Sequence, residues 1–141
     1  MNKLTWVIAI VFVIHGIGHV MCLLPALGLD ASPTWNSDSW LLTGIIGQPA
    51  ANVVSIVIWL AAIIGFLLAA LALMGWGVPH EWWRPLAVVS AVISLIGVFL
   101  FRNAFAAWFN KAGAITVDLA VLIGLLLLHW PAEQQLRVNS S

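Results

Sequence analysis

Four long runs of apolar residues, separated by short polar segments, dominate the pattern of hydrophobic and polar positions along the chain. The runs cover approximately residues 4–24, 50–74, 85–109 and 112–130, and the only proline within them, Pro85, opens the third run. At about 1.5 Å per residue, a run of about 21 residues reaches roughly 31 Å, the thickness of a bilayer's hydrocarbon layer. Backbone groups in lipid must be hydrogen-bonded within their own segment, so these runs are predicted to be transmembrane helices.

The connections between the runs predict how the helices are arranged. Short connections make neighbouring helices antiparallel, and one longer loop, residues 25–49, joins the first two. Small residues, among them Ser94 in the third run, recur every three or four positions, which lets helices approach closely in a membrane. The sequence therefore predicts an all-α integral membrane protein, a single domain of residues 1–141 folded as an up-down-up-down four-helix bundle.

Composition supports the membrane interpretation and excludes other classes of protein. The chain is 63% hydrophobic and 7% charged, whereas soluble domains are roughly 45–50% apolar and about 25% charged. Such hydrophobicity also excludes intrinsic disorder. The formal net charge is zero, so there is no basic patch for a nucleic-acid partner. The single cysteine, Cys22, excludes a disulfide framework.

Aromatic and basic residues indicate where the membrane surfaces lie. Every tryptophan except Trp59 falls at one of the two predicted membrane surfaces, as expected of side chains that prefer the interface. Lys3, Arg84 and Arg137 belong to the side that carries both termini, and the loop 25–49 contains no lysine or arginine. The chain is therefore predicted to be a multi-pass protein of the cell membrane with cytoplasmic N- and C-termini.

Four ionisable residues lie within the predicted spans and away from their ends, where a charged side chain is costly and therefore a candidate for function. His15 and His19 are one helical turn apart on the first run. If the third and fourth runs form a hairpin that turns at residues 110–111, Arg102 and Asp118 lie at the same depth and form a structural ion pair. All four side chains are then predicted to meet in the outer leaflet of the bundle.

This predicted polar cluster suits two kinds of ligand. His15, His19 and Asp118 match the two-histidine, one-carboxylate set that binds transition metals. Alternatively, His15, His19, Arg102 and Asn103 would offer hydrogen-bond donors to a redox cofactor such as a quinone. Two histidines on one helix face cannot sandwich a haem, which leaves only a haem with a single protein ligand. The leading hypothesis is a site for a redox cofactor (quinone or haem) or a metal ion.

Two other functions are also compatible with the sequence, and the residues alone do not decide whether the chain is an enzyme. In the first, the cluster is purely structural, and the chain is an accessory or assembly subunit of a larger membrane complex or a homo-oligomer. In the second, a line from Asp118 through the histidines to His129 relays protons in coupled transport of a small molecule. In every case the lipid bilayer is the expected partner.

The step Ile14-His15-Gly16 late in the first run, together with four predicted helices and a length of 141 residues, resembles the DoxX-like group of small bacterial membrane proteins. The resemblance implies a four-helix fold and a link to quinol or thiol redox chemistry, and of the motif only His15 and Gly16 carry over. That group usually has an acidic residue early in its second span, and this chain has none between Asn52 and Met74.

Overall fold

The structure, a computed structural model, describes residues 3–29, 34–105 and 107–136. Helices dominate, and no strand occurs among the residues described. In chain order the elements are α1 (Lys3–Gly18), α2 (Val20–Ala26), α3 (Leu42–Ile46), α4 (Gln48–Met74), the 3-10 turn η1 (His80–Trp82), α5 (Trp83–Leu100), α6 (Trp108–Leu122), the π-helical segment η2 (Ile123–Leu127) and α7 (Glu133–Leu136).

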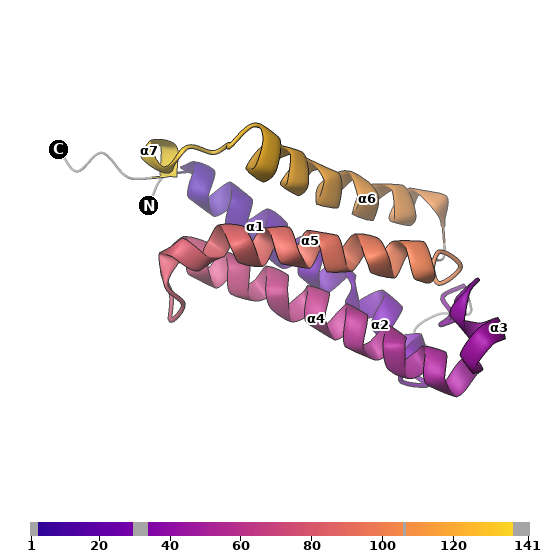
Figure 1. The fold of residues 1–141 in the computed structure, drawn as a ribbon. Helices are drawn as coiled ribbons and strands as arrows, with labels where there is room; N and C mark the ends of the chain where they lie inside the picture. The colour runs from indigo at the N-terminus through magenta and orange to yellow at the C-terminus, as the bar shows by residue number, and fades with distance from the viewer. Residues whose placement is uncertain (1–2, 30–33, 106, 137–141) are drawn as a thin grey trace.

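Among the residues described, four stretches are long and apolar enough to cross a membrane, which confirms the prediction of four such helices in an all-α fold. They are Lys3–Ala26, Gln48–Met74, His80–Leu100 and Trp108–Leu127. The long helices lie side by side, with α7 near the start of α1 (Figure 1). We call this the termini end of the bundle. The opposite end carries residues 34–47 and the described residues between α5 and α6, 101–105 and 107, and we call it the loop end.

The observed helix ends differ from the predicted ones where the chain stays apolar without staying helical. The third run was expected to be helical to residue 109, but α5 ends at Leu100 and α6 begins at Trp108. In the turn between them, Phe101 and Ala104 are fully buried. Hydropathy cannot distinguish a buried turn from a continuing helix, so the hairpin turns several residues earlier than expected.

The first run is also interrupted. Helix α1 ends at Gly18 and α2 begins at Val20, with His19 in a turn between them. The amide of His19 donates to the carbonyl of Gly16 at 3.2 Å, and the His19 carbonyl accepts from Cys22 and Leu23. The backbone hydrogen bonds therefore continue through the break, and the His19 side chain is carried at the junction of two helical segments.

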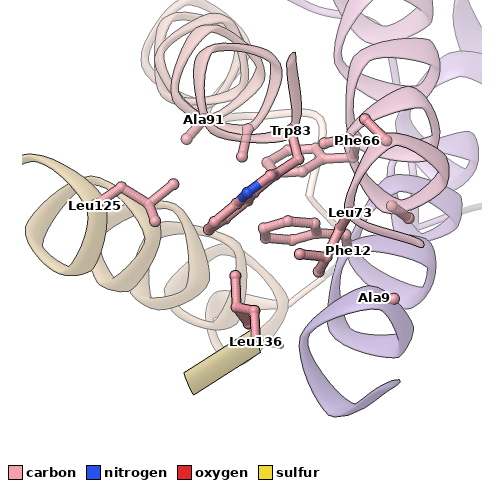
Figure 2. Close-up of a cluster of buried hydrophobic side chains, with 12 residues drawn as sticks. Ala9, Phe12, Phe66, Leu73, Trp83, Ala91, Leu125 and Leu136 are labelled. Atoms are coloured by element: carbon pink, nitrogen blue, oxygen red, sulfur yellow. The ribbon is translucent and has the colours of Figure 1, made fainter. Parts of the chain in front are cut away.

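Helix α4 packs against both α1 and α5, and α6 packs against α5. The core at the termini end gathers around Trp83, whose side chain points between the helices beside Phe12, with Leu125 and Leu136 close by (Figure 2). Trp83 stands at the predicted helix end, yet it is only 1% exposed. It is therefore a core residue, in contrast to its expected place at the membrane interface.

Glycines allow α4 and α5 to approach closely. A Cβ atom on Gly65 would lie 3.2 Å from the Cβ of Ser90, and one on Gly97 would lie 2.8 Å from the Trp59 ring. Close backbone approach of this kind is what holds helices together in lipid. The fourth span differs, because a Cβ on Gly113 of α6 meets nothing within 4 Å and one on Gly124 of η2 meets only the Trp130 carbonyl, at 3.6 Å. Of the four spans, Trp108–Leu127 is the least buried.

Candidate functional site

Asp118, a fully buried carboxylate on α6, connects three helical segments. Its Oδ1 lies 2.8 Å from Nε2 of His15 on α1, and its Oδ2 accepts a hydrogen bond of 2.5 Å from the hydroxyl of Ser94 on α5. The same hydroxyl oxygen lies 3.1 Å from Nε2 of His19. His15, His19, Ser94 and Asp118 therefore form one chain of hydrogen bonds, which we call the His–Ser–Asp network.

The direction of these hydrogen bonds follows from what each group can donate. Ser94 has one hydroxyl proton and donates it to Oδ2 of Asp118, so the Ser94 oxygen accepts from His19. His15 likewise donates from Nε2 to Asp118. These hydrogen bonds place a proton on Nε2 of each imidazole, and in the neutral tautomer with that proton Nδ1 is an acceptor. In the part of the chain that the structure describes, the hydrogen bonds of both imidazoles involve Nε2.

Aromatic packing holds the two imidazoles in place. Their ring centroids are 4.7 Å apart in an edge-to-face arrangement. The Phe66 ring meets His15 edge-on at 4.8 Å, and the Trp59 indole stacks on His19 at 5.2 Å. Such contacts add to the stability of a buried ring beyond the area that it buries. Each imidazole is therefore fixed both by a hydrogen bond and by a packed ring.

The two histidines line a pocket of about 440 Å³ at the loop end, where α1 and α2 face α6. This volume is typical of small-molecule sites, which are mostly apolar with a few placed polar groups. Besides the imidazoles, the polar side chain in its wall is that of Asn110, and three aromatic rings also contribute. We call this space the histidine pocket; its walls are Ile14, His15, Gly18, His19, Met21, Trp35, Phe105, Phe109, Asn110, Gly113, Ala114 and Val117.

The structure places Arg102 and Asn103 outside this site, which corrects two predictions. Both residues are exposed in the turn that follows α5. The Arg102 guanidinium lies over the Trp40 ring at 4.6 Å, and the Asn103 carbonyl accepts from Asn36 at 3.0 Å. The expected Arg102–Asp118 ion pair is thus replaced by the His15–Asp118 contact. The cause is the earlier turn, which brings Ser94, not Arg102, level with Asp118.

The predicted metal set of His15, His19 and Asp118 is brought together but not arranged around a common centre. Asp118 and His15 bind each other, and Nε2 of His19 is engaged by Ser94. Within residues 3–29, 34–105 and 107–136, no three His, Cys, Asp or Glu side chains are placed to hold a metal ion. The edge-to-face contact of the imidazoles also leaves no room for a haem between them.

Sequence reasoning missed Ser94 as a member of the network, because a serine among small residues is expected only to permit close packing. Ser94 can be identified from its depth in the bundle, which matches that of Asp118. That depth can be worked out only if the position of the turn between α5 and α6 is known. His129, considered as part of a proton relay, is exposed beyond η2 and outside the network.

No protein-family model, curated protein or solved structure matches the chain. Its function must therefore be inferred from the geometry of the site.

Proposed function

We propose that the chain crosses a cell membrane four times in an up-down-up-down bundle, with the termini end in the cytoplasm. Large apolar side chains such as Val57 and Phe99 are exposed on the outer faces of the helices, where water would be unfavourable and lipid is not. Trp6 and Trp76 meet edge-to-face at 6.0 Å at the termini end, as expected of an interfacial belt. The lack of lysine and arginine in the loop 25–49 supports the orientation.

Two exposed acidic residues at opposite ends of the bundle allow this topology to be tested. In a Cys22→Ala background, Asp38→Cys is expected to react with a membrane-impermeant thiol reagent added outside intact cells. Glu81→Cys is expected to react only after the cells are opened. The reverse pattern would invert the orientation, and reaction of both from outside would exclude a membrane between them.

Within that membrane, the function that the site supports best is binding of a lipophilic ring with hydrogen-bonding oxygens, of the quinone and quinol type. The observation that carries this proposal is the histidine pocket itself, an apolar and aromatic space with two imidazoles in its wall. Aromatic walls suit a flat ring, and the imidazoles suit the oxygens at its edge. The implied link of DoxX-like proteins to quinol chemistry agrees with this proposal.

The network behind the pocket defines what the protein contributes to such a ligand. Because Nε2 of both imidazoles is engaged within the network, Nδ1 is the ring nitrogen left for a ligand, and we propose that a bound hydroxyl group donates to it. If His15 accepts that proton, Asp118 at 2.8 Å stabilises the resulting imidazolium. The role of Asp118 resembles the carboxylate of a catalytic triad, which orients an imidazole and stabilises its charged form. The proposal concerns binding and proton acceptance, and leaves any electron acceptor to another component.

The test uses full-length protein in lipid nanodiscs and a tail-less methylated benzoquinone and its quinol as probes. Saturable binding is expected in the wild type, with affinity at least about tenfold lower in His15→Ala and in His19→Ala. His80→Ala removes an imidazole outside the pocket and is expected to bind as the wild type does. Absence of saturable binding, or equal binding by all four proteins, would overturn the proposal and favour a structural role in a larger complex.

A further inference from the structure

A second groove between α1 and α6 continues from the histidine pocket toward the termini end. Its volume is about 320 Å³, and its walls are apolar except for Thr116. Val117 lines both spaces, so the two adjoin along α6. We call the second space the tail groove; it is lined by Leu4, Val7, Ile8, Val11, Phe12, Trp83, Thr116, Val117, Ala120, Val121, Gly124, Leu125, Trp130 and Pro131.

The two spaces also share a continuous wall on α1. Val7 and Val11 line the tail groove, and His15 and His19 line the histidine pocket. Val7, Val11 and His15 are spaced by four, so they follow one another along one face of α1, and His19 comes next in the turn after Gly18. About 16 Å of helix axis separates Leu4 from His15. A molecule with its polar end at the imidazoles can therefore extend along this face without leaving the protein surface.

We propose that the tail groove holds the hydrocarbon tail of the ligand whose ring occupies the histidine pocket. The inference rests on the proposed function and narrows its substrate class to tailed lipids, such as a quinol with an isoprenoid or alkyl chain. Apolar walls match such a tail, and the least buried span, α6, forms one side of the entrance. The ligand thus reaches the imidazoles sideways from the bilayer.

A third groove shows why the tail is assigned to this side of α1. It measures about 400 Å³, is equally apolar, and lies between α1 and α4. It follows a different face of α1, formed by Trp6, Ile10 and Ile14, and Ile14 alone borders the histidine pocket as well. Like the tail groove, it contains no imidazole and shares one residue with the histidine pocket. It differs because α6, which together with α1 walls both the histidine pocket and the tail groove, takes no part in its wall. This groove therefore serves as an internal control.

Neighbouring residues on α1 provide matched variants. Val11 lies in the tail groove and Ile10 in the control groove, and their side chains are 41% and 49% exposed. Val11→Trp is expected to lower the affinity for a decyl-tailed quinol about tenfold and to leave the tail-less quinol within about twofold of the wild type. Ile10→Trp is expected to change neither. In these measurements the quinol concentration is expressed as its mole fraction in the nanodisc lipid, because the tail also dissolves in lipid outside the protein.

The outcomes separate this inference from the proposed function. If neither quinol binds the wild type, the proposed function fails. If both bind and Val11→Trp weakens both equally or neither, the histidine site stands and the tail groove is overturned. A quinol with a photoreactive group at the end of its tail needs no mutation, and it is expected to label Val7, Val121 or Leu125. Labelling of the control groove at Ile10 or Leu71 instead would overturn the inference.

Discussion

Two contacts between a histidine and a carboxylate, one at each end of the bundle, have the same chemistry and opposite surroundings. His15 and Asp118 are 2.8 Å apart, with side chains 8% and 0% exposed. His80 and Glu133 are 3.3 Å apart, with both side chains 45% exposed. Each joins segments that are far apart in the sequence. They differ in whether water can replace a lost partner.

This difference determines what each contact can do. At the termini end, Glu133 is also bound by Arg84 at 3.1 Å, and Arg84 donates to the carbonyl of Pro131 as well. Exposed pairs of this kind add little to stability, because water solvates the separated charges. In the His–Ser–Asp network, removal of one member leaves the others buried without a partner. The buried contact therefore fixes the positions of α1, α5 and α6, whereas the exposed contact only helps to attach α7.

The largest expected effect comes from removing each carboxylate in turn. Asp118→Ala leaves the Ser94 hydroxyl and Nε2 of His15 without an acceptor and is expected to lower the free energy of unfolding by about 2–3 kcal/mol. Glu133→Ala is expected to lower it by less than about 1 kcal/mol. Unfolding by titration with a denaturing detergent measures both. Equal losses would show that burial does not distinguish the two contacts.

The next effect concerns the oxidation state of the ring ligand. Because the ligand hydroxyl is proposed to donate to Nδ1, the pocket is expected to bind a quinol about tenfold more tightly than the corresponding quinone. The dimethyl ether of the quinol, which cannot donate, is expected to bind as weakly as the quinone. Equilibrium dialysis against protein in nanodiscs measures all three affinities. Tighter binding of the quinone would mean that the imidazoles donate, contrary to the direction assigned to the network.

A double-mutant cycle tests which side chain is the partner of Asp118. His15→Ala and Asp118→Ala are expected to be non-additive in the free energy of unfolding, with a coupling of about 1 kcal/mol. Arg102→Gln and Asp118→Ala are expected to add independently, because Arg102 lies over Trp40 in an exposed turn. Coupling to Arg102 instead would restore the ion pair that the sequence suggested and contradict the observed arrangement.

The fold was predictable to the extent that hydrophobicity determines it. The lengths of the apolar runs predicted four long helices, because a span needs a minimum length of apolar chain. Their ends were less predictable, since Phe101 and Ala104 are as apolar as the helix before them yet belong to a turn. The break at His19 has no signal in hydropathy either.

The sequence predicted which residues form the site better than it predicted which of them contact one another. His15, His19 and Asp118 were expected at one level of the bundle, and they do meet there through direct and Ser94-mediated hydrogen bonds. The partner of Asp118 depends on how α5 is shifted along its axis relative to α6. The turn was predicted a few residues too late, and the sequence therefore suggested Arg102 as the partner where the structure has Ser94 and His15. The ligand of the site stays a prediction.

The smallest expected effect, a dependence on pH and salt, belongs to the exposed contact. Burial raises the pKa of Glu133, but hydrogen bonds from His80 and Arg84 and their charges outweigh it, so its pKa lies below the ordinary value of 4.5. The folded state then binds this proton more weakly than the unfolded state does. The contact therefore stabilises the protein above about pH 4.5, and the contribution is lost as the pH falls through the lower folded pKa.

Glu133→Gln removes that titration and is the variant that measures it. The wild type is expected to exceed Glu133→Gln by less than about 1 kcal/mol at neutral pH. The gap should close in acid, and also in about 1 M salt, where exposed charges are screened within roughly 3 Å. The deficit of Asp118→Ala should persist in the same salt, because its contacts are out of reach of ions. A gap at Glu133 that survives both acid and salt would mean that its side chain acts through packing rather than charge.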